Sequence, residues 1–162
     1  MRGNEILSDG LLGTAAPVAA DVVLLIEIAM GAGLLIGAWL ARKKRFRQHA
    51  YCQSTIVLLN LIAIGAAMAP SFRANVLPRM PARLGKAYFA LAAAHAAFGT
   101  VTEVAALYIL LAAGTSLLPQ KLRITDYKAW MRCVLVLWWV VLLLGIATYT
   151  RWYVPRHIPK AM

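Results

Sequence analysis

The stretch DVVLLIEIAMGAGLLIGAWLAR, residues 21–42, decides the fold class of this chain. It is an almost unbroken apolar run, as long as the roughly 20 residues that a helix needs to cross the hydrocarbon core of a bilayer. Lipid offers the backbone no hydrogen-bond partners, so such a segment has to be helical. One residue interrupts the pattern, because Glu27 places a carboxyl group inside the run. The stretch therefore predicts a transmembrane helix and raises the question of what faces Glu27.

The rest of the chain repeats this pattern. Of its 162 residues 62% are hydrophobic and only 14% are charged, and the mean hydropathy is +0.70. Soluble domains are closer to half apolar. We predict an all-α integral membrane four-helix bundle with spans at about 20–41, 50–69, 88–113 and 129–150. The expected domains are an extramembrane N-terminal segment (1–19), a transmembrane domain (20–150) and a basic interfacial tail (151–162).

Proline is expected to end the second span. The span runs into Pro70, and the sequence PSFRANVLPRMPARLGK that follows contains three prolines and no long apolar run. Proline lacks a backbone N–H and normally breaks a helix. We therefore predict that the helix stops at Pro70 and that an extramembrane loop follows.

The chain is strongly basic, with 17 Lys and Arg against 6 Asp and Glu. These cations flank the apolar runs, where they meet lipid headgroups, so we expect the lipid bilayer as a partner and no nucleic acid. The densest cluster, ARKKRFR at residues 41–47, follows the first span. Because cations concentrate on the cytoplasmic side of membrane proteins, this cluster favours both termini outside.

Few polar residues interrupt the predicted spans, and they are candidates for handling protons or binding a quinone headgroup: Glu27, Gln53, Asn60, His95 and Glu103. Ionisable groups inside a membrane are costly and usually face a partner in the bundle. Counted from the same membrane face, Glu27 and His95 lie at about 9 and 10 Å, which makes them potential partners. Asn60 and Glu103 form a second pair nearer the midplane. The alternative is that these pairs only tie helices together.

Two further patterns concern metals and helix packing. His49, Cys52 and Cys133 are placed to converge at one membrane face, and such a set suits copper or zinc. The alternative is a headgroup-facing histidine with two packed thiols. His49 and His95 fall near opposite faces, which argues against a haem held between two histidines of this chain. Small residues recur every four positions in the first span, as a face for a further subunit or for packing within the bundle: Ala29, Gly33, Gly37 and Ala41.

The fourth span resembles a known family. YKAWMRCVLVLWWVVLLLGIATYTRWY is similar to the last helix of the domain of unknown function 420, a family of small four-helix bacterial membrane proteins, through Arg132, Trp138 or Trp139, Gly145 and Tyr149. The similarity extends over about residues 45–153, and the family's histidines in the second and third helices correspond to His49 and His95. Tyr127 stands where the family has histidine. The resemblance implies the bacterial inner membrane and an accessory role near respiratory electron-transfer systems.

These observations lead to three functional hypotheses. The first is an accessory transmembrane subunit that stabilises a respiratory or other electron-transfer complex by helix packing. The second is a redox or proton-handling protein that binds a quinone, a metal such as copper, or haem in the bundle. The third is a small transporter or channel. The sequence contains no nucleophile elbow, phosphate loop or zinc-helix motif, so it gives little support to catalysis by this chain.

Overall fold

The computed structural model describes residues 10–80, 85–119, 121 and 126–154. Within these ranges the fold is all-α, and four helical segments are long and apolar enough to cross a membrane. Their bounds are α1 (Val18–Arg42), α2 (Phe46–Ala63) continued by η1 (Ile64–Met68), α3 (Ala69–Asn75) and η2 (Leu77–Arg79), α5 (Ala87–Gly114), and α6 (Tyr127–Tyr153). The predicted four-helix transmembrane bundle is therefore confirmed.

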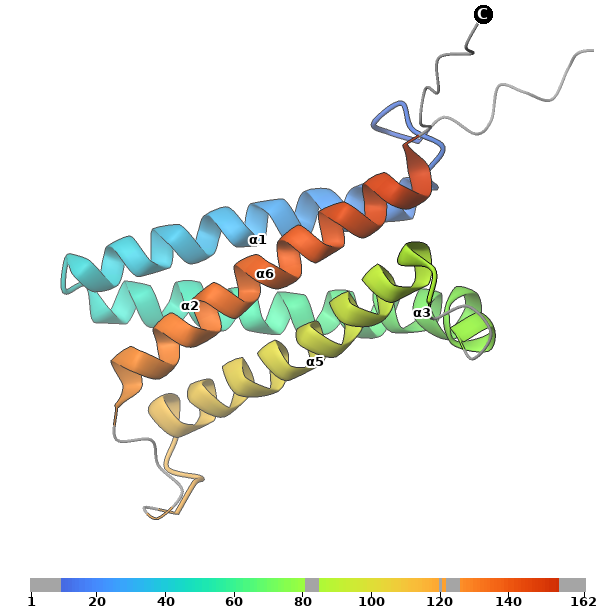
Figure 1. Cartoon of the computed structure of the whole chain (residues 1–162). Coiled ribbons are helices and arrows are strands. Elements are labelled where there is room, and N and C mark those ends of the chain that lie inside the picture. Colours follow the sequence, from blue (N-terminus) through green and yellow to red (C-terminus); the bar gives the residue numbers. More distant parts are fainter. Residues whose placement is uncertain (1–9, 81–84, 120, 122–125, 155–162) are drawn as a thin grey trace, which may run out of the picture.

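The four segments form two hairpins that pack on each other (Figure 1). Helix α1 packs along α2, and α5 packs along α6, while α1 also contacts α6 and α2 contacts α5. The α1–α2 turn and the start of the α5–α6 connection lie at one end of the bundle, which we call the loop end. The start of α1, the start of α5, α3 and the end of α6 lie at the other, which we call the open end.

Small residues of α1 bring two helix backbones together inside the bundle. A Cβ atom on Gly33 would lie 2.9 Å from Cδ1 of Ile56, and one on Gly37 would lie 3.1 Å from Cδ of Gln53. Both neighbours belong to α2. Of the predicted small-residue face, Ala29 is exposed and Ala41 is half-buried. Gly33 and Gly37 therefore pack against α2 within the bundle. An interface for a further subunit along the rest of this face stays a prediction.

The helix does not stop at Pro70, which corrects the prediction from sequence. A π-helical turn, η1, precedes the proline, and the backbone N–H of Ala69 donates to the carbonyl of Ile64, five residues back. This wider turn shifts the hydrogen-bond register, so that Pro70 falls in the first turn of α3, where its missing N–H costs little. Much of the expected loop is helical as a result.

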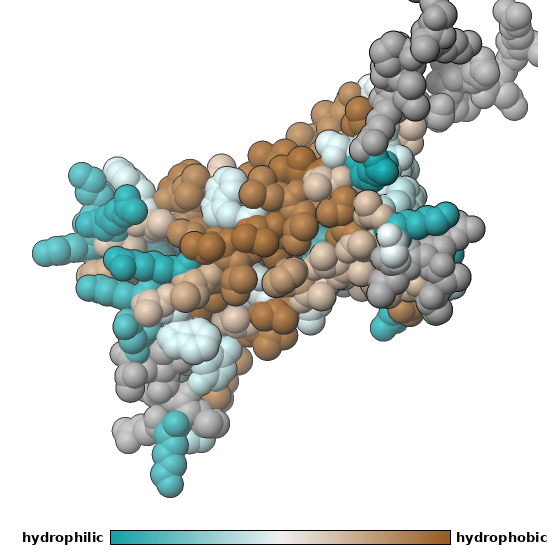
Figure 2. Space-filling model, viewed as in Figure 1, coloured by the Kyte–Doolittle hydropathy of each residue, from teal (hydrophilic) through white to brown (hydrophobic). Residues whose placement is uncertain are grey.

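The buried core and the exterior both fit a bilayer. The main apolar core occupies the half of the bundle nearer the loop end, and its buried residues are Met30, Leu34, Ile56, Val57, Ala106, Ile109, Val134 and Trp138. Apolar side chains also cover the middle of the visible exterior, with hydrophilic ones at the two ends (Figure 2). At the loop end Lys43, Lys44, Arg45 and Arg47 are exposed. This pattern is that of a multi-pass membrane protein, in which lipid covers the apolar band.

A candidate ligand cavity beside buried carboxyl groups

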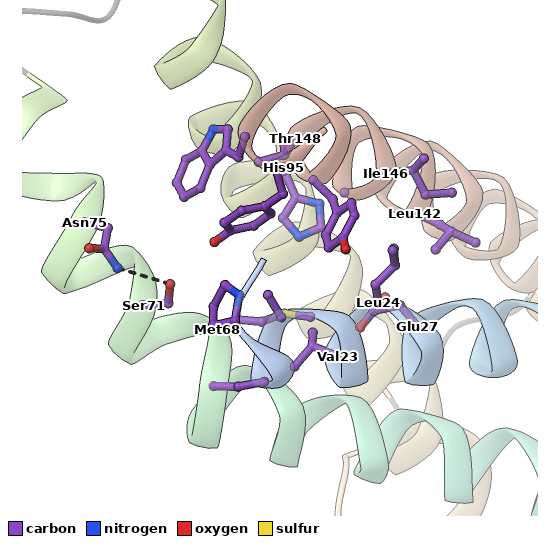
Figure 3. Close-up of a pocket in the computed structure, with 18 residues that line it drawn as sticks. Val23, Leu24, Glu27, Met68, Ser71, Asn75, His95, Leu142, Ile146 and Thr148 are labelled. Carbon is purple, nitrogen blue, oxygen red and sulfur yellow. Dashed lines mark hydrogen bonds between the residues drawn. The ribbon is translucent and has the colours of Figure 1, made fainter. Parts of the chain in front are cut away.

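Two adjoining cavities occupy the half of the bundle nearer the open end. Their volumes are about 290 and 340 Å³, and they share six lining residues: Glu27, Met68, Ser71, His95, Thr148 and Trp152. The π-helical turn and α3 form one wall, while α1, α5 and α6 supply the others. Figure 3 shows Glu27 of α1, His95 of α5 and Met68 of η1 around the first cavity. The lining is mainly apolar and aromatic with a few polar groups, which is the usual character of a small-molecule site.

Glu27 and His95 meet at this cavity but do not form the predicted pair. The imidazole Nδ1 of His95 donates to the backbone carbonyl of Val141 on α6, over 3.0 Å. Gly145 makes room for the ring, because a Cβ there would lie 3.0 Å from its Cε1. The prediction of a common layer is correct, since both side chains line the same space. Among the described residues no hydrogen bond joins the two side chains, and Nδ1 of His95 is used by the carbonyl of Val141 on α6.

The second predicted pair is formed. The side-chain amide of Asn60 on α2 donates through Nδ2 to Oε2 of Glu103 on α5, over 2.9 Å. Asn60 also lines the second cavity, so it lies between that cavity and Glu103. Gln53, predicted in the same stripe as Asn60, lies instead over Gly37 in the α1–α2 contact and lines neither cavity.

Glu27 and Glu103 are both buried without enough hydrogen bonds. Glu27 is 7% exposed and Glu103 is 4% exposed. Within the described part of the chain, the Oε1 atom of each carboxyl group is buried and has no hydrogen-bond partner. An unpaired buried polar group is costly, and an unpaired charge is more so. Among the described residues, the only other buried side-chain N or O atom without a partner is the indole Nε1 of Trp139.

A polar network at the open end was not predicted. Asp21 is fully buried, and its Oδ2 accepts from the backbone N–H of Leu12 over 3.0 Å, while its Oδ1 accepts from the hydroxyl of Tyr149. Because Tyr149 gives its only proton to Asp21, the Thr14 hydroxyl donates to the Tyr149 oxygen over 2.7 Å. The network ties residues 10–17 to α1 and α6. The sequence analysis placed Asp21 at the start of an apolar run and used Tyr149 only for the family resemblance, so it missed their contact.

The predicted metal set does not assemble. The Nδ1 atom of His49 donates to the carbonyl of Gly37 over 2.8 Å, and Sγ of Cys52 donates to the carbonyl of Gly33 over 3.4 Å. Cys133 on α6 is exposed. No group of three or more His, Cys, Asp or Glu side chains able to hold a metal ion exists among the described residues. The close approach of α1 to α2 exposes two α1 carbonyls to His49 and Cys52, which explains why these side chains turn toward α1.

The fold and the cavity define a class of protein: a four-helix membrane protein whose bundle contains a mainly apolar cavity with a few polar groups on its wall. His95 carries its proton on Nδ1, because it faces a carbonyl, so Nε2 is left as an acceptor. Glu27 supplies a carboxyl group to the same cavity. Together they offer an amphipathic ligand one imidazole and one carboxyl group in a half-open, mainly apolar cavity.

No family model, curated protein or solved structure matches this sequence. The resemblance to the domain of unknown function 420 therefore stays a prediction.

Proposed function

We propose that this protein binds a lipid-soluble quinone in the cavity and handles its protons there. The observation that carries the proposal is the joint presence of Glu27 and His95 on the wall of a half-open cavity lined mainly by apolar residues. A quinone headgroup presents carbonyl oxygens when oxidised and hydroxyl groups when reduced. A protonated carboxyl group donates to the first form, and an unprotonated imidazole nitrogen accepts from the second.

The walls of the cavity also suit such a ligand. The ring of Trp152 lines both cavities, while Trp138 and Phe72 line the second and Tyr149 lines the first. Aromatic and aliphatic walls bind a flat ring by burial of apolar surface. The combined space is of the size that small-molecule sites occupy. The quinone tail would leave the bundle toward lipid, which surrounds it.

The two histidines provide a matched experiment. His95 and His49 each donate to a carbonyl of a neighbouring helix, but only His95 lines the cavities. The protein is purified in mild detergent, and ubiquinone and menaquinone are extracted and quantified against protein. We expect quinone in wild type and His49→Ala, and its loss in His95→Ala.

Detergent can also remove a quinone, so binding is measured a second way. A short-chain quinone is titrated into the extracted protein, and quenching of tryptophan fluorescence is followed, because Trp138 and Trp152 line the cavity. Saturable quenching that weakens in His95→Ala but not in His49→Ala supports the proposal. Quenching that does not saturate, or that is equal in all three proteins, contradicts it.

The role of accessory subunit stays a prediction with less support than before. Its proposed interface was the small-residue face of α1, and α2 occupies Gly33 and Gly37 within the bundle. Co-purification with a respiratory or other electron-transfer complex in mild detergent remains its test. A complex would contact another lipid-facing surface, and quinone binding is compatible with it.

We also propose that the protein lies in the bacterial inner membrane with the loop end in the cytoplasm. The exposed cations at residues 42–47 support this orientation, since such clusters are retained on the cytoplasmic side. Both termini would then lie outside. A C-terminal alkaline phosphatase fusion is expected to be active, and an active cytoplasmic reporter at the same position would reverse the orientation.

A further inference from the structure

The interior of the bundle contains buried carboxyl groups that face no basic Lys or Arg side chain among the described residues. Glu27 on α1 and Glu103 on α5 are both buried, and the Oε1 atom of each has no hydrogen-bond partner among the described residues. Asn60 satisfies only Oε2 of Glu103. Among the described residues, no Lys or Arg side chain lines either cavity.

The titratable groups on the neighbouring elements do not supply the missing charge. From α5, His95 lines the same cavity, but its Nδ1 is used by the carbonyl of Val141. From α6, Tyr149 donates to Asp21, and Tyr153 lines the first cavity. The described residues that line the cavities from α2, η1 and α3 include polar Asn60, Ser71 and Asn75 but no ionisable side chain. Asp21, one and a half turns before Glu27, adds a further acid rather than a counter-charge.

Two ionised carboxyl groups cannot remain in this environment alone. The cost of burying an unpaired charge is large, and a second like charge nearby increases it. Something positive must therefore occupy the site, either a proton or a metal ion. Calcium and magnesium require about six or more oxygen ligands. The pair offers two unpartnered oxygens, and Asn60 directs its N–H rather than its carbonyl at Glu103.

We propose that the two buried carboxyl groups of Glu27 and Glu103 hold at least one proton between them at neutral pH, and that Glu27 exchanges a proton through the cavity. Glu27 is the member that lines both cavities, so it is the point of exchange. Asn60 holds the second carboxyl group in place and also borders the second cavity. The site goes beyond the proposed quinone binding and does not require it.

Infrared spectroscopy tests the proposal directly. A protonated carboxyl group has a C=O stretching band that an ionised one lacks, and the band shifts in heavy water. We expect this band at neutral pH in wild type and its complete loss in the double variant Glu27→Gln/Glu103→Gln. Asp126→Asn is the control, because Asp126 is exposed and caps the start of α6. Absence of the band in folded wild type overturns the proposal.

A hydrophobic carbodiimide locates the proton and separates it from a metal ion. Such a reagent modifies protonated carboxyl groups in apolar surroundings, and peptide mass spectrometry identifies the residue. We expect modification at Glu27 first, unaffected by sodium ions at constant pH. Protection by sodium at constant pH would assign the site to a metal ion instead and overturn the proposal.

Failure of the quinone proposal and failure of the proton-site proposal give different experimental results. Both measurements are made on quinone-free protein and on His95→Ala. If quinone binding is wrong but the proton site is right, the infrared band remains in both while quinone titration gives no saturation. If the band is absent while the titration saturates, the proton site fails, and quinone binds without a protonated Glu27 as its donor.

Discussion

The two halves of the bundle use the same kind of residue differently. Toward the loop end, His49 donates to the carbonyl of Gly37, beside a continuous apolar core. Toward the open end, His95 donates to the carbonyl of Val141 in the same way, but its ring borders a cavity. The difference lies in the packing: glycines bring α1 against α2 in the first half, and a π-helical turn forms a cavity wall in the second. A histidine in a membrane helix becomes a candidate site only where packing leaves space beside it.

The largest loss of stability is expected from a substitution in the α1–α2 contact near the loop end. In Gly37→Leu, the new side chain would overlap the amide of Gln53 and the thiol of Cys52. Overpacking of this kind costs about 3 kcal/mol of unfolding free energy. The measurement is unfolding by a denaturing detergent, followed by circular dichroism.

Gly65→Leu is the matched control for that substitution. Nothing lies within 4 Å of the position that a Cβ on Gly65 would occupy. We expect this variant to unfold near wild type. Equal destabilisation by both substitutions would mean that the space around Gly37 in the α1–α2 contact is no more restricted than the space around Gly65.

The next largest loss of stability is expected from the hydrogen bonds around Asp21 at the open end. Tyr149→Phe removes the hydroxyl that donates to Asp21 and accepts from Thr14, leaving a fully buried carboxyl group with one donor fewer. Hydrogen bonds to charged groups contribute about 2 kcal/mol, so we expect a loss of that size in the same unfolding assay.

Tyr153→Phe provides the comparison for this network. Its hydroxyl makes no hydrogen bond among the described residues. Tyr153 contacts the N-terminal segment through its backbone carbonyl, which accepts from the backbone N–H of Ala15 over 3.2 Å. That bond survives the substitution. A loss in Tyr153→Phe as large as in Tyr149→Phe would show that the hydroxyl network does not stabilise the open half.

A smaller loss is expected between the halves, where Asn60 meets Glu103. Asn60→Leu keeps the approximate volume but removes the only hydrogen-bond donor to that carboxyl group among the described residues. Hydrogen bonds between membrane helices are worth about 1 kcal/mol. The unfolding assay gives the stability, and the infrared band tests whether Glu103 remains protonated without its donor. An unchanged stability would indicate that the Asn60–Glu103 bond contributes nothing net.

The smallest change in stability should come with a clear change in binding. In Gly145→Ala the new methyl group would lie 3.0 Å from Cε1 of His95 and would displace the ring. Its packing cost of about 1 kcal/mol is offset by about 1 kcal/mol from replacing glycine with alanine in a helix. We expect near-normal unfolding and weaker quinone quenching. Gly99→Ala, whose Cβ would lie 3.6 Å from Val141, should bind like wild type.

Sequence patterns predicted much of the fold and part of the candidate site. Apolar runs and the needs of the backbone in lipid predicted the four spans, and the end of each run marked the loops well except at Pro70. Helix periodicity placed Glu27 and His95 in one layer and paired Asn60 with Glu103. It failed at Pro70 because a π-helical turn depends on the register of backbone hydrogen bonds, which composition does not encode. It failed for Asp21 because Tyr149 lies 128 residues away in sequence.

The sequence by itself determined that this protein is a membrane-spanning helical bundle, since long apolar runs in lipid leave the backbone no other way to satisfy its hydrogen bonds. Only the tertiary structure decided which polar groups meet and which remain unpaired. Whether His95 finds Glu27 or a carbonyl, and whether Gly33 and Gly37 face a partner or α2, depends on how helices rotate and approach one another. Those choices follow from the packing of the whole bundle, and local sequence does not fix them.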